Sequence, residues 1–170
     1  IPILSEECAH RTAYDERQHW EQFWLVDPLD GTKEFLKRNG QFTVNIALIE
    51  HCRPIAGVVH APALDLLYYC EPGGGAYKLH EGRLEKLAQR VWKPPHKLRI
   101  VGSLSHPTPE LEAFVAEQRQ RYPEVEFVPM GSSLKICLVA EGAADVYPRL
   151  GPTMEWDTAA AQAVAEAAGC

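Results

Sequence analysis

Short hydrophobic runs separated by turn residues organise the first half of the chain. Residues 23–27 (FWLVD) and 42–50 (FTVNIALIE) are rich in aromatic and β-branched residues and alternate in part with polar ones, as strands do. The runs at 54–62 and 64–71 follow closely enough for an antiparallel meander, and the PGGG at 72–75 is typical of a turn. The pattern predicts a mainly antiparallel sheet in this half.

The hydrophobic pattern changes after a polar stretch at 83–95 that ends in KPPHK. Strand-like and helix-like segments then alternate, which predicts an α/β layer with mixed or parallel strands. One helix has a clear start, because Thr108 suits the N-cap and Pro109 the first helical position. The strands expected here are 97–103, 124–129 and 145–150, and the expected helices are 108–121, 132–142 (closed by Gly142) and 157–169.

The polar stretch divides the chain into two expected halves, residues 1–95 and 96–170. The opening residues IPILSEE are typical of a strand already under way, and the last helix ends at Gly169, next to the final residue. We therefore expect the first half to be incomplete at its N-terminus and the second at its C-terminus.

Composition narrows the class of protein. The 170 residues are 46% hydrophobic and 24% charged, which suits a folded globular protein rather than a disordered one. A formal net charge of −6, without a basic run, argues against binding to a nucleic-acid polymer. Five scattered cysteines without a CxxC pair indicate reduced thiols and a cytoplasmic location, and no apolar run reaches the roughly 18 residues of a transmembrane helix.

Four acidic residues share one kind of context, because Glu6, Asp27, Asp30 and Asp157 each lie where an apolar segment gives way to a turn or helix. Taken singly, each has a plainer interpretation: Asp157 as a helix N-cap, Glu6 as a surface charge, and DPLDG as an ordinary turn. Taken together, carboxylates brought side by side repel unless a shared proton or a divalent cation neutralises them. Oxygen ligands without His or Cys favour magnesium or a close relative.

The residues beside the two aspartates of DPLD extend this interpretation. Pro28 fixes one backbone angle and removes an amide hydrogen, so the carbonyl of Leu29 is available to a cation. Gly31 and Thr32 then offer backbone N–H groups at a predicted helix start, a place suited to phosphate. The motif therefore combines cation ligands and anion donors within six residues.

The sequence DPLDGTKEF (27–35), followed more than a hundred residues later by WDTAAA (156–161), resembles the two signatures of a phosphatase superfamily that is magnesium-dependent and lithium-inhibited. That superfamily includes inositol monophosphatase, fructose-1,6-bisphosphatase and the 3'(2'),5'-bisphosphate nucleotidases. LSEE (4–7) is similar to a third piece of the signature. The runs 42–50 and 131–153 resemble the CysQ type of bisphosphate nucleotidase, so the likeness extends over nearly the whole chain.

The resemblance implies a layered α-β-α-β-α sugar-phosphatase fold and a hydrolase that uses two or three Mg²⁺ ions, with Mn²⁺ as a substitute and Li⁺ as an inhibitor. Thr32 matches the threonine that hydrogen-bonds the attacking water, and its aspartate partner lies on a segment upstream of residue 1; with Asp27 it forms the implied catalytic pair. Ala161 departs from the family, where glycine is usual. The implied metal site is Glu6, Asp27, the Leu29 carbonyl, Asp30 and Asp157.

The expected substrate depends on groups that converge on the cleft. Basic groups favour a nucleotide with two phosphates over an inositol phosphate. Read alone, His106 suits a surface loop, Lys135 a solvated helix charge and Ser132 a helix N-cap, while Ser133 is assigned to the turn and cap. The resemblance instead implies that the substrate is bound by Leu29, Asp30, Gly31, Thr32, His106, Ser132, Lys135, Arg149 and Asp157.

The activity that the resemblance implies is hydrolysis of the 3'-phosphate of adenosine 3',5'-bisphosphate to give AMP, with the corresponding phosphosulfate as a second substrate and a role in sulfur metabolism. One alternative is an inositol or sugar phosphatase of the same superfamily. Another is a metal- and phosphate-binding module without catalysis. The implied protein is cytoplasmic, either free or peripheral on the inner membrane, and is a monomer or a homodimer that binds a small nucleotide.

Several other residues have expected structural roles. His60, within an apolar strand run, is expected to be a hydrogen-bonded core histidine, and Cys137 a buried small hydrophobe. Trp20, Trp24, Tyr68 and Tyr69 are expected to be core or sheet-face aromatics.

Overall fold

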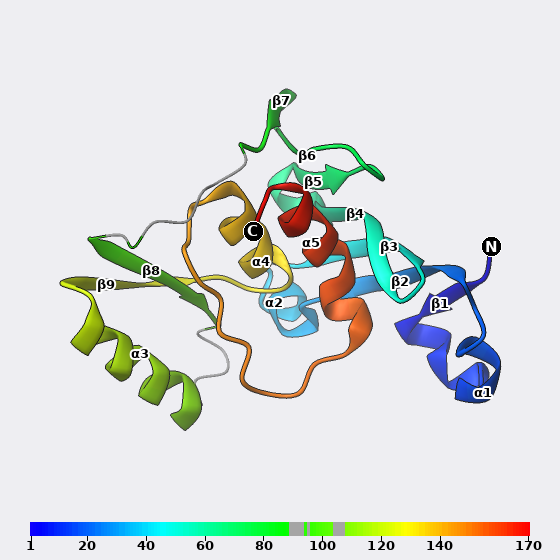
Figure 1. The fold of residues 1–170 in the computed structure, drawn as a ribbon, viewed down its shortest axis with the longest axis horizontal. Coiled ribbons are helices and arrows are strands. Elements are labelled where there is room, and N and C mark those ends of the chain that lie inside the picture. Colours follow the sequence, from blue (N-terminus) through cyan, green and yellow to red (C-terminus); the bar gives the residue numbers. More distant parts are fainter. Residues whose placement is uncertain (89–93, 95, 104–107) are drawn as a thin grey trace.

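The computed structural model describes residues 1–88, 94, 96–103 and 108–170. It is a mixed α/β fold with one large sheet, one small sheet and helices around them, as the sequence predicts (Figure 1). Within these residues no helix is both long and apolar enough to cross a membrane. The strands are β1 (Ile3–Ser5), β2 (Gln22–Asp30), β3 (Thr43–Glu50), β4 (Arg53–Ala61), β5 (Leu66–Cys70), β6 (Ala76–His80), β7 (Arg83–Lys86), β8 (Lys97–Gly102) and β9 (Glu124–Pro129). The helices are η1 (Glu6–Arg11), α1 (Tyr14–Arg17), α2 (Thr32–Lys37), η2 (Pro62–Leu64), α3 (Pro109–Arg121), α4 (Leu134–Glu141) and α5 (Glu155–Ala167).

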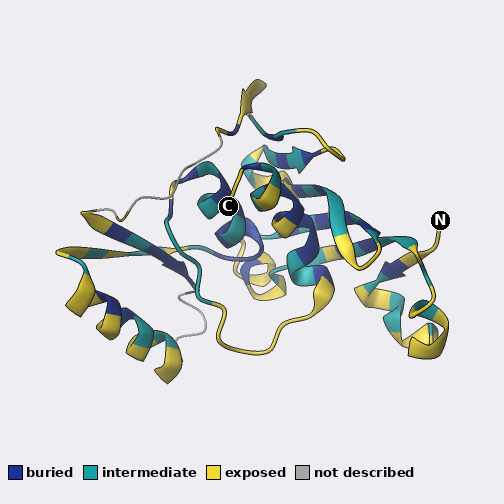
Figure 2. Ribbon diagram, in the orientation of Figure 1, coloured by how far each residue is buried: buried dark blue, intermediate teal, exposed yellow. Residues whose placement is uncertain are grey.

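The large sheet has seven strands in the order of the sequence, from β1 to β7. Only β1 and β2 run parallel, and the other neighbours are antiparallel, so the expected antiparallel meander is confirmed. Alternate residues of β3 are buried, and helix α5 packs against strands β2 to β6 on that face (Figure 2). The small side chains of α5, mostly alanine, let the helix lie close to the sheet.

The small sheet consists of the parallel strands β8 and β9, with helix α3 beside it. Helix α3 starts as predicted, because the hydroxyl of Thr108 accepts a hydrogen bond from the backbone N–H of Leu111 at 3.2 Å. A separate hydrophobic cluster, centred on Leu98, Ile100 and Val115, holds this part together. Helix α4 contacts both α5 and β8 and so connects the two sheets.

The prediction of a strand at 145–150 is wrong. Only Val146 pairs with β8, through a single bridge to Ile100. Arg99 fixes the start of this segment by donating two side-chain hydrogen bonds to Asp145, at 2.7 and 3.0 Å. Pro148 has no N–H to donate, so a strand ladder cannot continue past it.

Other differences from the prediction are smaller. Strands β6 and β7 are additional, and β7 occupies the first residues of the polar stretch 83–95, of which 89–93 and 95 lie outside the described residues. The helices expected at 132–142 and 157–169 begin and end within two residues of α4 and α5. His60 is exposed rather than buried, because it points away from the α5 side of β4. Cys137 is fully buried, as expected.

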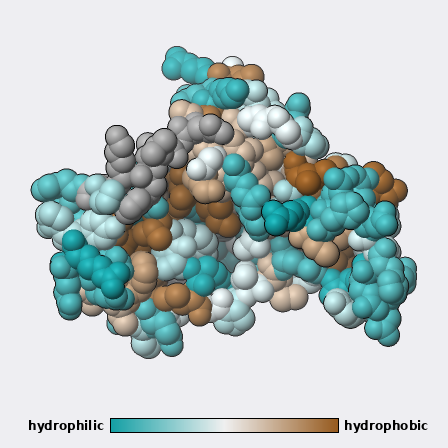
Figure 3. Space-filling view, viewed as in Figure 1, coloured by the Kyte–Doolittle hydropathy of each residue, from teal (hydrophilic) through white to brown (hydrophobic). Residues whose placement is uncertain are grey.

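The face of the large sheet opposite α5 is also apolar. Trp24, Ile46 and Leu48 lie there, half-buried, as do Val58 and Tyr69 on the next strands. The ring of Tyr69 stacks on that of Tyr77 with centroids 5.2 Å apart. In the view of Figure 3, by contrast, the left and right margins of the molecule are mainly hydrophilic.

Candidate active site

A β-bulge at the end of β2 brings Asp27 and Asp30 to the same face of the sheet. Residues three apart on a regular strand point to opposite faces. Here Asp27 pairs with Asn45 but Asp30 pairs with Thr43, so the register shifts by one residue between them. Because Thr43 and Asn45 share the buried face of β3, both aspartates lie on that face, toward α5.

Asp27 is almost completely buried, with 1% of its surface exposed. Its Oδ1 accepts a hydrogen bond from the backbone N–H of Leu29 at 2.9 Å, which closes the turn around Pro28. Burial raises the pKa of Asp27 to about 7, and the nearby carboxylates of Asp30 and Glu6 also favour its neutral form. Glu6 reaches this place because β1 runs parallel to β2, with Ser5 opposite Val26, although Glu6 itself is exposed.

Asp30 is held by the loop that precedes α4. The backbone N–H of Ser133 donates to Oδ2 of Asp30 at 2.5 Å. Longer contacts reach the same oxygen from Thr43 Oγ1 at 3.4 Å and from Asn45 Nδ2 at 3.5 Å. Burial raises the pKa of Asp30, while Lys135 opposes that shift. Asp30 thus joins the large sheet to α4.

Helix α2 begins where the sequence predicts a helix start. Gly31 is its N-cap residue and has φ +88°, a backbone conformation that residues with a Cβ rarely adopt. A Cβ at this position would also lie 3.3 Å from Cβ of Ser132, so the DGT turn and the loop before α4 pack closely. The adjacent Thr32 is exposed and faces the cleft described below.

Asp157 approaches from the start of α5, at the third helical position. Its Oδ2 accepts hydrogen bonds from Thr153 Oγ1 at 2.8 Å and from the N–H of Met154 at 3.0 Å. It therefore caps the helix while its charge acts on Asp30 and raises the pKa of that carboxyl. The interpretation of Asp157 as the N-cap residue is wrong in position, because Met154 is the N-cap and Asp157 caps the helix from the third position; its role in a metal site stays a prediction.

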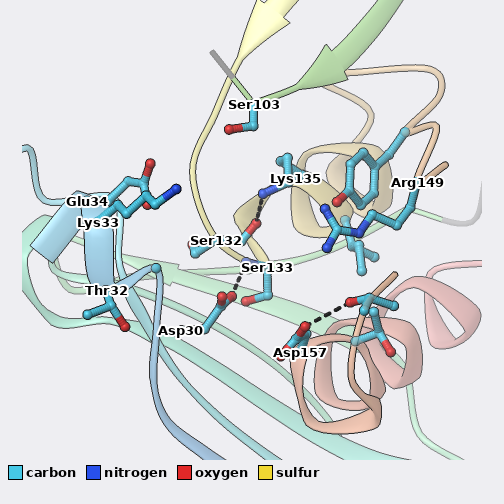
Figure 4. A pocket seen from close by; sticks show the side chains of 15 residues that line it. Asp30, Thr32, Lys33, Glu34, Ser103, Ser132, Ser133, Lys135, Arg149 and Asp157 are labelled. Atoms are coloured by element: carbon cyan, nitrogen blue, oxygen red, sulfur yellow. Dashed lines mark hydrogen bonds between the residues drawn. The ribbon is translucent and has the colours of Figure 1, made fainter. Parts of the chain in front are cut away.

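These elements enclose a cleft of about 250 Å³ (Figure 4). Asp30 and Asp157 lie on one side of it, and Lys135 and Arg149 lie opposite. Figure 4 also places Thr32 and Glu34 of α2 at one end and Ser103, just after β8, at another. The cleft is lined by Asp30, Gly31, Thr32, Lys33, Glu34, Ser103, Ser132, Ser133, Lys135, Ile136, Tyr147, Arg149, Thr153, Asp157 and Thr158.

Lys135 is a buried lysine rather than a solvated one, with 8% of its surface exposed. Its ammonium donates to the backbone carbonyl of Ser132 and lies 5.5 Å from the centre of the Tyr147 ring. Burial lowers the pKa of Lys135, and Asp30 opposes that effect by favouring the charged form. Arg149 is exposed and donates to the carbonyl of Pro152 at 2.7 Å, so its remaining donors can meet a ligand.

The cleft contains most of the residues that the sequence singles out, but not all. Asp30, Gly31, Thr32, Ser132, Lys135, Arg149 and Asp157 line it together. Glu6, Asp27 and Leu29 are not among the lining residues; Asp27 interacts electrostatically with Asp30 and Glu6 and accepts the hydrogen bond from Leu29. His106 lies outside the described residues. Their catalytic, metal-binding and substrate-binding roles stay predictions.

The carboxylate oxygens of the acidic residues are ligands that a hard cation prefers, and these residues interact with one another in pairs. In the described part of the chain, no group of three or more His, Cys, Asp or Glu side chains is close enough to hold one ion. The electrostatic contacts instead link Glu6 with Asp27, Asp27 with Asp30, and Asp30 with Asp157. Mg²⁺ is commonly bound by one or two carboxylates, completed by water and substrate phosphate, so pairs of this kind suit it.

Several residues of the site carry no signal that the sequence reveals. Glu34 is buried, at 7% exposure, although it sits in a polar hexapeptide helix. Ser103 and Tyr147 reach the cleft from β8 and from the segment wrongly expected to be a strand. Thr43 and Asn45 read as ordinary polar positions in a strand, and only the bulge opposite them reveals their contact with Asp30.

The inositol monophosphatase family matches this chain over residues 1–170. The 3'(2'),5'-bisphosphate nucleotidase CysQ of Salmonella typhimurium is 52% identical over 169 residues, and that of Escherichia coli K12 is 51% identical. The alignments cover 99% of this chain but 65% of each relative, so the chain spans less than two thirds of their length.

A solved structure of similar fold is CysQ from Bacteroides thetaiotaomicron, described as a bacterial member of the inositol monophosphatase family. It is 47% identical in sequence, with a TM-score of 0.89. The match covers 99% of this chain and 66% of that one. Sequence and fold therefore point to the same group of proteins.

Proposed function

The chain belongs to the inositol monophosphatase family, and we propose that it is part of a metal-dependent phosphatase that acts on small phosphate esters. The family is generally metal-dependent. The proposed reaction is hydrolysis of the 3'-phosphate of adenosine 3',5'-bisphosphate to AMP, with adenosine 3'-phosphate 5'-phosphosulfate as a second substrate. The name of the relatives, 3'(2'),5'-bisphosphate nucleotidase, supports this choice.

The observation that carries the proposal is the division of charge across one cleft. Asp30 and Asp157 face Lys135 and Arg149 over a cavity of about 250 Å³. A cation held by the carboxylates needs an anion beside it, and the two basic residues supply the opposite charge for further anionic groups of the same ligand. A substrate with two phosphates matches such a cleft better than one with a single phosphate.

The metal, for which Mg²⁺ is the proposed ion and Mn²⁺ a substitute, supplies the charge that polarises the phosphate group. Asp27, Asp30 and Asp157 would hold such ions in pairs, Asp27 with Asp30 and Asp30 with Asp157, with Glu6 and the Leu29 carbonyl beside them. Thr32, at the exposed start of α2, would orient the attacking water. Lys135 would hold a phosphate as a point charge, and Arg149 would bind one with its two parallel donors.

Ser132 is the further polar contact that we assign to the nucleotide, together with His106 from the predicted set. A cytoplasmic location, which the scattered cysteines and the resemblance both favour, and an assembly as a monomer or a homodimer stay predictions. So does the division of labour between a metal-binding half, residues 1–95, and a nucleotide-binding half, residues 96–170.

Phosphate release by the full-length protein tests the proposed reaction. Adenosine 3',5'-bisphosphate and inositol 1-phosphate are compared at equal concentration with Mg²⁺, and the nucleotide product is identified by chromatography. We expect AMP, rather than adenosine 3'-phosphate, and turnover of the bisphosphate at least tenfold faster than that of inositol phosphate. Faster turnover of inositol phosphate would move the protein to the inositol or sugar phosphatases of this family.

Binding without turnover would be a different result. If calorimetry detects Mg²⁺-dependent nucleotide binding by the full-length protein while no phosphate is released, the protein is a binding module and the proposed reaction is wrong. An assay in excess EDTA is the matched control, because a metal-dependent phosphatase must lose activity there and regain it when Mg²⁺ is restored.

A further inference from the structure

A buried set of hydrogen bonds joins Asp30 to Ser133, which also lines the cleft, and to two residues of β3. Thr43 and Asn45, on β3, are 0% and 1% exposed, and Ser133, before α4, is 4% exposed. The hydroxyl of Ser133 donates to Oδ1 of Asn45 at 2.8 Å and lies 2.9 Å from Oγ1 of Thr43. Both strand residues therefore hold the serine hydroxyl, while the serine N–H holds Asp30.

The donor–acceptor distances show which of these contacts acts most directly on Asp30. The bond from the Ser133 N–H to Asp30, at 2.5 Å, is the shortest of the three contacts that reach Oδ2. The direct contacts of Thr43 and Asn45 with Asp30, at 3.4 and 3.5 Å, are too long to dominate. Thr43 and Asn45 therefore act on Asp30 mainly through Ser133.

All of these contacts reach one oxygen of Asp30. The backbone N–H of Ser133 and both side chains of β3 meet Oδ2, and within the described residues no hydrogen bond meets Oδ1. Asp30 also lines the cleft (Figure 4). A carboxylate fixed through one oxygen has a defined rotamer, and its second oxygen stays available to a ligand.

Backbone strain at Ser132, next to Ser133, also supports a role of this loop in holding Asp30. Ser132 has φ +49°, a left-handed conformation that is unfavourable for a residue with a Cβ. Strain of this kind persists where the surroundings impose it, commonly at functional sites. Here it lies at the residue whose following N–H group meets Asp30.

We infer that Ser133, anchored by Thr43 and Asn45, is a positioning residue that fixes the carboxylate of Asp30 for a divalent cation. This inference rests on the proposed function, because it assigns Asp30 to the metal site. Neighbours of this kind orient metal ligands, and their loss commonly weakens metal affinity or activity by about 10–100-fold. Ser133 belongs to the site rather than only to the turn and cap that the sequence suggests.

Mn²⁺ binding to the full-length protein, followed by the electron paramagnetic resonance of the free ion, tests the inference. Thr43→Val keeps the shape of the side chain and removes its hydroxyl, and Ser133→Ala removes the hydroxyl that Thr43 and Asn45 hold. Each variant is expected to bind Mn²⁺ about tenfold more weakly than the wild type. Thr43→Ser keeps the hydroxyl and is expected to stay within about twofold of the wild type.

Tyr68→Phe is the matched control for a general loss of stability. It removes another buried hydroxyl, which donates to Glu141 at 2.9 Å, outside the cleft lining. We expect wild-type Mn²⁺ affinity in this variant even where its melting temperature falls as far as that of Thr43→Val.

The outcomes separate the two claims. Wild-type affinity in Thr43→Val and Ser133→Ala, or an equal loss in Tyr68→Phe, overturns the positioning role and leaves the proposed function standing. A wild-type protein that binds no Mn²⁺ overturns both. Tenfold weaker binding in Thr43→Val and Ser133→Ala, with Thr43→Ser and Tyr68→Phe unchanged, supports both.

Discussion

A buried ammonium group gives Lys135 a role that a surface lysine would not have. It lies in the cleft between the charges of Asp30 and Arg149, where burial lowers its pKa. A site that keeps a charge under these conditions is suited to bind an anion, because the anion offsets the desolvation of the ammonium. We therefore propose that Lys135 binds a phosphate of the substrate.

Lys135→Met should raise KM for adenosine 3',5'-bisphosphate by about 10–100-fold, since a hydrogen bond to a charged group contributes about 1.5–3 kcal/mol. Steady-state kinetics on the full-length protein measures the change. Lys97→Met is the control, because Lys97 lies on β8 at the surface and pairs with Glu124 and Glu126. Equal KM values in the wild type and Lys135→Met would contradict the assignment.

The cysteines also differ in how far their side chains are buried. Cys137 is fully buried and burial raises the pKa of its thiol, whereas Cys52 is exposed in the turn between β3 and β4. Because the thiolate is the reactive form, iodoacetamide at pH 8 should modify Cys52 at least tenfold faster than Cys137 in the native protein. Peptide mass spectrometry reads both rates, and similar rates would mean that α4 does not pack as described. Both thiols should react equally in denaturant.

At this scale the sequence reveals charged residues better than neutral ones. Asp30, Asp157, Lys135 and Arg149 are singled out because they belong to motifs that resemble those of one family, although charges of this kind also have plain structural explanations when each is taken alone. Ser133 is not, because serine at a helix start has an ordinary explanation as a cap. Its actual partners lie about ninety residues away in the chain, on β3.

At the scale of elements, the packing of α5 on β4 brings Asp157 to the site. Gly57 of β4 lies directly under the helix, and a Cβ there would stand 2.2 Å from the carbonyl oxygen of Ala160 and 3.0 Å from Cβ of Ala163. The absence of a side chain at this position is therefore what lets α5 lie close to the sheet.

Gly57→Ala should lower the free energy of unfolding by about 1–3 kcal/mol or more, because the helix backbone must move to admit the methyl group. Urea denaturation measures the loss. Gly151→Ala is the control, since a Cβ at that position meets nothing within 4 Å, and its effect should be below about 0.5 kcal/mol. Equal stability of the two variants would mean that α5 lies farther from β4.

Elements with strong periodicity or clear caps are predictable from the sequence, and their irregularities are not. Helix α3 is marked by Thr108 and Pro109, and the meander by short turns between apolar runs. The bulge in β2 has only Pro28 as a signal, and which side it turns Asp30 to depends on the pairing with β3. The wrongly predicted strand at 145–150 is a similar case, because the hydrogen bonds between Arg99 and Asp145 fix the path of the backbone there and no local sequence pattern encodes them.

For the whole molecule, the carboxylates of Asp30, Asp157 and Glu6 around the buried Asp27 predict that a divalent cation stabilises the fold. A ligand that binds only the folded state at 100 times its Kd adds about 2.7 kcal/mol. For a chain of this size that corresponds to a rise in Tm of about 5–10 °C. Calorimetry with Mg²⁺, and then with excess EDTA, checks the effect. If neither Mg²⁺ nor excess EDTA changes the Tm, no divalent cation binds between these acidic residues.

The mixed α/β class also follows from the sequence, because apolar runs predict a sheet in the first half and strands alternate with helices in the second; the layered arrangement is what the resemblance implies. The junction between the two sheets cannot be predicted from the sequence. Helix α4 connects the sheets through contacts with α5 and β8, and no local pattern encodes these contacts. The cleft lies at that junction, where Lys135 of α4 meets Asp30 of β2.

The most direct test of the account is a crystal structure of the full-length protein grown with Mn²⁺ and AMP, with the ion located by its anomalous scattering. We predict anomalous peaks within coordination distance of the carboxylates of Asp27, Asp30 or Asp157, with the phosphate of AMP between such an ion and the side chains of Lys135 and Arg149. Peaks only at other acidic residues, with AMP outside the cleft, would contradict the account.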